Sequence, residues 1–236
     1  MEVAVAEVGL IIPAAGMGTR LGSELPKALH AIGGTTVLAH ALRAGVGSGT
    51  VSSIVIAAPS RWETRIHEQL EYELPDTVEA RVVEGGERRQ DSVRRAMDAL
   101  PGNIDIVLVH DAARCLTPPA LFGDVVSAVA GGHDAVVPGL PVVDTLREVD
   151  DRGVVVRTPD RTVLRAVQTP QGFRREVLED AYRAAAPDEP ATDDASLVER
   201  TGHQVHIVPG HSEAFKVTHP LDVLLAEALL ARRASS

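Results

Sequence analysis

VGLIIPAAGMGTRLG, residues 8–22, followed by LPK at 25–27, is the part of the sequence that says most about the fold. Its first six residues form an apolar run that predicts a buried strand. The strand passes directly into a loop of small residues and glycines. Backbone N–H groups of such a loop can approach phosphate oxygens closely, so we expect an anion-binding site immediately after the strand.

Further apolar runs repeat the pattern of residues 8–13 along the first half of the chain. They lie at 53–58, 80–83, 105–110 and 134–138. Between them, apolar residues recur at helical spacing at 37–44, 62–70, 92–100 and 119–130. Alternating strands and helices predict an α/β fold with a doubly wound, mostly parallel sheet, and ligands are expected at the carboxyl ends of its strands.

The second half of the chain departs from this pattern. Residues 142–149 and 154–157 flank the turn sequence DDRG, which predicts a β-hairpin. A hairpin has little core of its own, so this one lies across the domain or projects as an arm, over residues 139–160. The sheet is expected to resume at 163–168. Helices are predicted at 176–186, at 193–201 with Thr192 as N-cap, and from 220 to about 233, all within a single domain of residues 1–236.

Composition excludes several classes of protein. Apolar residues make up 44% of the chain, enough for a packed core, while no apolar run is long enough to cross a bilayer. A net charge of −10 disfavours binding to nucleic acid. The single cysteine, Cys115, cannot form an internal disulfide and is expected to be buried. We therefore expect a soluble cytoplasmic protein that binds neither nucleic acid nor membrane.

The glycine-rich loop matches neither of the two common phosphate-binding motifs. A P-loop has Lys and then Ser or Thr directly after its last glycine, whereas Ser23 follows Gly22 here. A dinucleotide-binding loop has glycine where Leu21 stands. The loop instead carries Arg20 and Lys27, two cations that can contact phosphate oxygens.

These cations suit the attack of one phosphate on the α-phosphorus of a nucleoside triphosphate. The barrier to that reaction comes largely from bringing two anions together, and fixed positive charges lower it. A general base is hardly needed, because a phosphate monoester with a second pKa near 6 is already mostly a dianion at neutral pH. The residues alone therefore predict a nucleotidyltransferase.

Four further segments narrow this prediction. They are GGERRQDSV at 85–93, HDAAR at 110–114, TPQGF at 169–173, and TDDAS at 192–196 with KVT at 216–218. Together with the loop, from about residue 8 to residue 230, they resemble the 2-C-methyl-D-erythritol 4-phosphate cytidylyltransferases. That family has a Rossmann-like nucleotidyltransferase fold. The resemblance implies that this chain uses CTP as a substrate and Mg²⁺ as a cofactor.

The resemblance implies a role for individual residues. Nucleotide contacts fall on Ala14, Ala15, Gly16, Gly18, Gly85, Gly86, Ser92, Asp111 and Ala112. Contacts to the polyol phosphate fall on Arg114, Thr145, Arg161, Thr169 and Thr192. The catalytic cations would be Arg20, Lys27, Arg161 and Lys216, and Asp111 would be the metal ligand. The hairpin would be the arm of a homodimer, so that some of these residues serve the neighbouring subunit's site.

Simpler structural roles are open for several of these residues. Ser92 has the position of a helix N-cap, Asp111 that of a turn residue, and Asp193 with Asp194 that of favourable acids at a helix N-terminus. His203, His206 and His211 are too loosely spaced for a zinc site.

The sequence departs from the family pattern at two positions. Cys115 stands where proline is usual, and Glu213 stands where we expect a shorter aspartate near Lys216. Neither change removes a charge that the chemistry needs.

The leading hypothesis is transfer of CMP from CTP to 2-C-methyl-D-erythritol 4-phosphate with release of pyrophosphate, in non-mevalonate isoprenoid precursor biosynthesis. Three alternatives are open at this stage. The substrate could be another polyol phosphate such as ribitol 5-phosphate, the nucleotide could be a guanylyl or uridylyl group, or the chain could be a nucleotide-binding regulator without turnover. A protein that only bound a nucleotide would not need four cations in one site, so the set Arg20, Lys27, Arg161 and Lys216 argues against a regulator.

Overall fold

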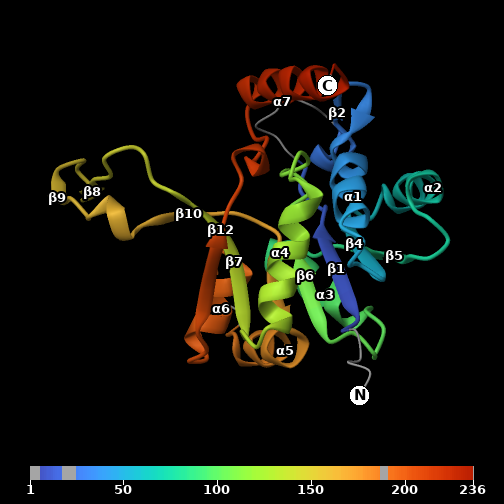
Figure 1. Ribbon diagram of the computed structural model, residues 1–236, viewed down its shortest axis with the longest axis horizontal. Helices are drawn as coiled ribbons and strands as arrows, with labels where there is room; N and C mark the ends of the chain where they lie inside the picture. Colours follow the sequence, from blue (N-terminus) through green and yellow to red (C-terminus); the bar gives the residue numbers. More distant parts are fainter. Residues whose placement is uncertain (1–5, 18–24, 187–190, 236) are drawn as a thin grey trace.

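A mixed eight-stranded sheet forms the centre of the protein (Figure 1). The computed structural model describes residues 6–17, 25–186 and 191–235. Along the sheet the strands follow the order β10-β7-β11-β6-β1-β4-β5, and β12 pairs with β7. Their bounds are β1 Val8–Pro13, β4 Ser53–Ala58, β5 Glu79–Glu84, β6 Ile106–Val109, β7 Ala135–Pro141, β10 Arg165–Val167, β11 Gln171–Arg174 and β12 Val205–Pro209.

Most of the sheet is parallel, as predicted. β1 pairs in parallel with β4 and β6, β4 with β5, and β7 with β12. β11 lies antiparallel between β6 and β7, and β10 pairs antiparallel with β7. The apolar pattern predicted neither β11 nor β12. β11 has Phe173 as its one large apolar residue, and the side chains of β12 are only partly buried.

Helices cover both faces of the sheet, which confirms the doubly wound fold. On one face α1, α2, α4 and α7 contribute side chains to a core that includes Leu10 and Ile12. On the other face α3, α5 and α6 pack against Ile11 and Val107. Successive residues of β1 thus point to opposite layers, because side chains of a strand alternate between its faces.

The helices match the predicted positions closely. Their bounds are α1 Val37–Gly47, α2 Glu63–Glu73, α3 Arg89–Asp98, α4 Pro119–Ala130, α5 Arg175–Ala184, α6 Asp194–Arg200 and α7 Pro220–Ala234. Short elements complete the described chain: β2 Ala31–Ile32, β3 Thr35–Thr36, and the 3-10 turns η2 Lys27–Leu29, η3 Arg161–Val163 and η4 Ser212–Ala214. Within the described residues, every helix is too short or too polar to span a bilayer.

The predicted N-cap of α6 is wrong by one residue. Asp193, not Thr192, precedes the helix, and its Oδ1 accepts a hydrogen bond from Ser196 N at 3.0 Å. A carboxylate at this position satisfies an N–H group that lacks a partner in the first helical turn. Thr192 lies outside the helix, where its side chain lines a cleft described below.

The predicted hairpin is present and projects from the body of the protein (Figure 1). Its strands are β8 Glu148–Val149 and β9 Val155–Arg157, so the first strand is shorter than the predicted 142–149. Asp150 shapes the turn, because its Oδ1 accepts hydrogen bonds from Arg152 N and Val154 N. Gly153 takes the left-handed conformation with φ of 78°, which favours glycine. β7 extends to Pro141, so the residues numbered 139–141 lie in the main sheet.

Candidate active site

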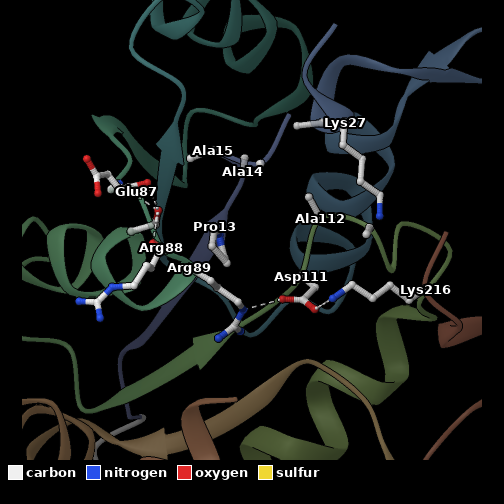
Figure 2. Close-up of a pocket in the computed structure, with 15 residues that line it drawn as sticks. Pro13, Ala14, Ala15, Lys27, Glu87, Arg88, Arg89, Asp111, Ala112 and Lys216 are labelled. Atoms are coloured by element: carbon white, nitrogen blue, oxygen red, sulfur yellow. Dashed lines mark hydrogen bonds and ion pairs between the residues drawn. The ribbon is translucent and has the colours of Figure 1, made fainter. Parts of the chain in front are cut away.

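A pocket of about 340 Å³ opens at the carboxyl ends of the central strands (Figure 2). Segments far apart in the sequence form its walls, because the carboxyl ends of parallel strands meet at one edge of a sheet. Of the predicted nucleotide-binding residues, it brings together Ala14, Ala15, Gly16, Gly86, Ser92, Asp111 and Ala112. Two predicted catalytic cations, Lys27 and Lys216, line the same pocket.

The loop after β1 and the turn after β5 fit against each other without room for additional side-chain atoms. A Cβ atom on Gly85 would lie 2.4 Å from the Cβ of Ala15, and one on Gly86 would lie 2.2 Å from the Cβ of Asp91. The Gly86 N–H donates a hydrogen bond to the Ser92 hydroxyl at 3.0 Å. Ser92 therefore holds the glycine turn in place from within α3.

The helix-capping role considered for Ser92 is wrong. α3 begins at Arg89, and its N-cap is Arg88. Asp91 is the residue that reaches back to this cap, since its Oδ2 accepts from Arg88 N at 3.2 Å. The Ser92 hydroxyl, inside the first turn, remains beside the pocket that it lines.

Asp111 is held between two cations. Arg89 Nε donates to its Oδ1 at 3.0 Å, and Lys216 Nζ donates to its Oδ2 at 2.7 Å (Figure 2). Burial alone would raise the pKa of Asp111, but the attraction of Arg89 and Lys216 outweighs it and lowers the pKa well below the usual value. Asp111 therefore provides a fixed negative charge in the pocket. A role as a turn residue alone would not account for its two ion pairs.

Thr169 and His110 fix the backbone beside this carboxylate. The Asp111 N–H donates to the Thr169 hydroxyl at 3.0 Å, and the same hydroxyl lies 3.0 Å from His110 Nδ1. His110 is fully buried and packs against Phe122 with ring centroids 4.9 Å apart. Burial lowers the pKa of His110 to about 4, because a charged imidazole loses its hydration there.

This shift predicts a loss of stability in mild acid. Between pH 6.5 and pH 4 the unfolded His110 takes up a proton that the folded residue refuses, so the free energy of unfolding falls as the pH is lowered through this window. The total loss is on the order of 3 kcal/mol. In His110→Asn, which cannot titrate, denaturant unfolding should show a correspondingly weaker pH dependence over that range. An unchanged dependence would contradict the assignment.

A second cleft, of about 210 Å³, lies on the other side of Asp111. Three predicted polyol-phosphate residues line it, namely Arg114, Thr169 and Thr192. Arg89, Asp111 and Lys216 line both this cleft and the larger pocket, so they form a shared wall between them. Arg114 is anchored at the cleft by hydrogen bonds from Nη1 to Ala214 O at 2.7 Å and from Nη2 to Val167 O at 3.2 Å.

Thr145 and Arg161 are not brought into either cleft of their own chain. Both are exposed, Thr145 in the arm and Arg161 in the turn η3 that directly follows it. Arg161 Nη1 donates to the carbonyl of Val143, which is on the arm. Two further predicted residues, Gly18 and Arg20, lie outside the described part of the chain.

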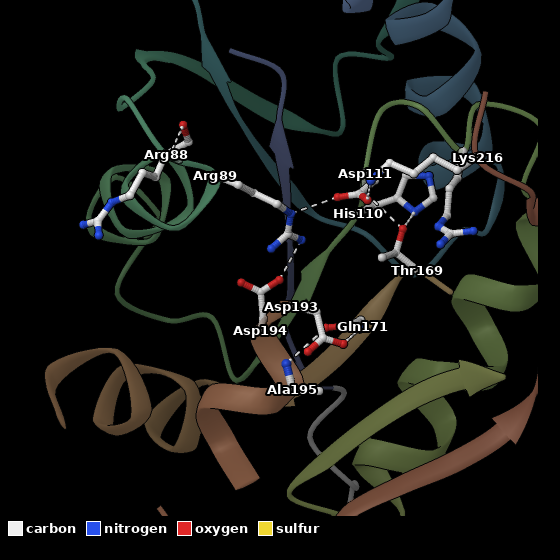
Figure 3. A network of polar contacts seen from close by, with 12 residues as sticks. Arg88, Arg89, His110, Asp111, Thr169, Gln171, Asp193, Asp194, Ala195 and Lys216 are labelled. Carbon is white, nitrogen blue, oxygen red and sulfur yellow. Dashed lines mark hydrogen bonds and ion pairs between the residues drawn. The ribbon is translucent and has the colours of Figure 1, made fainter. Parts of the chain in front are cut away.

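Several residues that shape the site were missed in the sequence. Arg89 had no predicted role although it lines both clefts, and Gln171 contacts both Asp193 and Ala195 N (Figure 3). Asp194 is 1% exposed and pairs with Arg89, so it is more than a favourable acid at a helix N-terminus. The available signal was that Arg89, Gln171 and Asp194 each lie within a segment that carries the family resemblance, but such a segment does not identify a contact partner.

The chemistry of Asp111 fits a magnesium ion bound mainly through phosphates. A carboxylate offers about four lone-pair positions, and Arg89 with Lys216 occupy two of those of Asp111. Mg²⁺ commonly takes only one or two protein carboxylates beside substrate phosphates and water. Among the described residues, no group of three or more His, Cys, Asp and Glu side chains is arranged to hold a metal by itself.

Comparison with known families and sequences gives a consistent result. Residues 8–232 match the family described as 2-C-methyl-D-erythritol 4-phosphate cytidylyltransferase. The chain is 51% identical to the protein of that name from Streptomyces avermitilis, over 97% of this chain and 93% of the relative. It is also 51% identical to the one from Nocardia farcinica, over 95% and 94% of the two chains.

Solved structures with the same fold include two crystal structures of related name. The 4-diphosphocytidyl-2C-methyl-D-erythritol synthase from Anaerococcus prevotii superposes with a TM-score of 0.84 at 28% identity, covering 96% of this chain and 99% of the other. The 2-C-methyl-D-erythritol 4-phosphate cytidylyltransferase from Thermus thermophilus superposes with a TM-score of 0.76 at 38% identity, covering 95% and 99%.

Proposed function

This chain belongs to the 2-C-methyl-D-erythritol 4-phosphate cytidylyltransferase family, and on that premise we propose how its residues carry out the reaction. The enzyme transfers CMP from CTP to 2-C-methyl-D-erythritol 4-phosphate and releases pyrophosphate, in isoprenoid precursor biosynthesis. The assignment of each substrate to a cleft and of each side chain to a role is our proposal.

One observation carries the assignment: two clefts share the wall formed by Arg89, Asp111 and Lys216. CTP occupies the larger pocket, with its phosphates against the loop after β1 and against Lys27. The polyol phosphate occupies the smaller cleft, between Arg114, Thr169 and Thr192. The two substrates therefore meet at the shared wall, which is where the bond is formed.

The reaction proceeds by direct attack of phosphate on phosphorus. An oxygen of the polyol phosphate attacks the α-phosphorus of CTP, and the bond from that phosphorus to the bridging oxygen breaks, so that pyrophosphate leaves with the electron pair. Lys216 orients the attacking phosphate, while Lys27 and Arg20 stabilise the negative charge that develops on the triphosphate. No side chain has to remove a proton, because the attacking phosphate is already ionised.

Mg²⁺ would be held by the triphosphate and by Asp111, and when bound it neutralises phosphate charge as a Lewis acid. Asp111 is kept ionised for this role by Arg89 and Lys216, which lower its pKa. We assign the nucleotide base and ribose to the part of the pocket lined by Gly86, Ser92 and Ala112. Gly85 stands next to this part, in a turn whose close packing leaves no room for a side chain.

We also propose that the enzyme works in the cytoplasm and that it is a homodimer assembled through the arm and the turn η3 that follows it. Their exposed apolar side chains include Val143, Leu146, Val149, Val154, Val155, Val156 and Val163. A monomer gains nothing from exposing this many valines on one projecting segment, whereas a partner subunit would bury them. Thr145 and Arg161 lie on the same segment, so we assign them to the polyol-phosphate cleft of the neighbouring subunit.

Arg161→Ala is expected to impair use of the polyol phosphate selectively. The variant removes a cation that contacts this substrate and leaves the triphosphate pocket untouched, so the KM for 2-C-methyl-D-erythritol 4-phosphate should rise or kcat/KM for it should fall by about tenfold or more. CTP binding, measured by calorimetry, should be nearly unchanged. Arg157→Ala, which removes an arginine of the adjoining arm, is the matched control. A variant that weakens CTP binding alone would contradict the assignment.

The overall function is tested by measuring pyrophosphate release. CTP, UTP, GTP and ATP are each paired with 2-C-methyl-D-erythritol 4-phosphate, ribitol 5-phosphate and a small set of sugar phosphates, with and without EDTA. We expect turnover with CTP and 2-C-methyl-D-erythritol 4-phosphate, dependent on divalent cation. Faster turnover with another polyol or another triphosphate would overturn the substrate assignment.

A further inference from the structure

A series of polar contacts runs from helix α5 to the wall that the two clefts of the active site share. Tyr182 of α5 donates a hydrogen bond from its hydroxyl to Asp194 Oδ1 at 2.5 Å. Asp194 Oδ2 lies 2.7 Å from Arg89 Nη2, and Arg89 Nε in turn donates to Asp111 at 3.0 Å. The series ends at Lys216, on the other oxygen of Asp111 (Figure 3).

The carboxylate of Asp194 lies beyond the reach of the substrates. It is 1% exposed, and neither cleft includes Asp194 or Tyr182 among its lining residues. A buried carboxylate costs free energy unless charge and hydrogen bonds compensate it. Arg89 supplies the compensating charge here, and Asp194 consequently restricts where the Arg89 guanidinium can lie.

Arg89 has two anionic partners on opposite sides. One nitrogen faces Asp194 and another faces Asp111, so Arg89 presents only Nε to the active-site carboxylate. Without the charge of Asp194, the planar guanidinium would be free to turn both Nε and a terminal nitrogen onto Asp111, the geometry that arginine and carboxylate prefer. That rotation would compete with Lys216 for Asp111.

We propose that Asp194 and Tyr182 are positioning residues for the reaction, which act through Arg89 to keep Asp111 shared with Lys216. Tyr182 holds the Asp194 carboxylate by a hydrogen bond. Asp194 binds one terminal nitrogen of Arg89, so that only Nε of Arg89 contacts Asp111. The second oxygen of Asp111 is then available to Lys216. Lys216 is thereby fixed at the wall where the two phosphates meet. This inference rests on the proposed role of Lys216.

The test is a double-mutant cycle on steady-state kinetics. Asp194→Asn keeps the shape of the side chain and removes its charge, and it is expected to lower kcat by about 10- to 100-fold, the scale of a misplaced catalytic group. In the Lys216→Ala background the same substitution should lower kcat by less than about threefold, because the group that it positions is already gone. Tyr182→Phe should show the same pattern with a smaller loss.

Val198→Ala is the matched control for damage to the fold. Val198 is fully buried on α6 together with Asp194 but takes no part in the series of polar contacts. It should lower the midpoint of thermal unfolding and leave kcat nearly unchanged at a temperature where the variant is folded. If Asp194→Asn does not fold, Tyr182→Phe carries the test, since it removes a single hydroxyl.

The outcomes separate this inference from the proposed function. Full activity of Asp194→Asn, or a loss of the same size with and without Lys216, would overturn the positioning role. Full activity of Lys216→Ala would instead refute the proposed role of the lysine itself. A kcat loss in Val198→Ala equal to that in Asp194→Asn would show that packing of α6, and not the series of polar contacts, controls turnover.

Discussion

Lys27→Ala is expected to lower turnover by about 10² or more while the fold stays intact. The side chain lines the nucleotide pocket from the first residue of η2, and the backbone N–H of Lys27 donates to Gly16 O at 3.3 Å, which places it against the phosphate-binding loop. Removing its charge leaves the developing negative charge on the triphosphate without a preorganised partner. The effect should appear in kcat as well as in kcat/KM, because the charge grows as the transition state forms.

Arg43→Ala is the matched control for the Lys27 prediction. Arg43 also carries a positive charge, and it is paired with Glu73 away from both clefts. Its removal should change the net charge by the same amount and leave turnover unaffected. Circular dichroism and thermal unfolding would confirm that Lys27→Ala is folded, and normal turnover of that variant would refute the proposed role.

Lys216→Ala is expected to have an effect of similar or larger size, about 10² to 10³ in kcat/KM for the polyol phosphate. Lys216 follows η4, and its neighbour Val217 is tied to the loop after β6 by a hydrogen bond from Val217 N to Ala113 O at 2.8 Å. Without the lysine, the Asp111 carboxylate would face the incoming phosphate with only Arg89 to balance it. The substitution therefore removes the attraction between Lys216 and the substrate phosphate, and it leaves the repulsion between that phosphate and Asp111 less well balanced.

The kinetic pattern distinguishes this role from a general loss of affinity. CTP binding, measured by calorimetry in the absence of the polyol phosphate, should fall much less than kcat/KM for the polyol. Thr218→Ala, two residues after Lys216 and without a change of charge, is the control for disturbance of this segment. A Lys216→Ala enzyme that loses CTP binding but reacts normally at saturating CTP would contradict the account.

Two strands with long apolar runs could be predicted to the residue, and the bounds of β5, β6 and β7 differ from the prediction by one to three residues. β1 and β4 begin and end at the residues where their buried, Val- and Ile-rich runs do. β11 could not be recognised, because Gln171 and Gly172 lie in the strand on account of their neighbours β6 and β7 and not of their own propensity. Pairing with adjacent strands determines whether such a short segment forms a strand.

The residues of the candidate site likewise include some that could be predicted from the sequence and some that could not. Gly86 and Asp111 each lie two residues after a strand, and the carboxyl ends of parallel strands predict that they meet in one place. The partners of Asp194 could not be predicted, because α5 and α3 bring Tyr182 and Arg89 to it only in the folded chain. Thr145 on the arm and Arg161 on the following turn η3 line neither cleft of their own chain, so a single chain does not determine what they contact in an assembly.

In the proposed mechanism, cations from distant parts of the chain converge on the reacting phosphates. The most direct measurement is a crystal structure of the complete protein with the CDP-alcohol product and Mg²⁺. We expect the Nζ atoms of Lys27 and Lys216 each to lie within hydrogen-bonding distance, about 2.7–3.2 Å, of phosphate oxygens of the same product molecule. A complex in which either ammonium group points away from the product into solvent would contradict it.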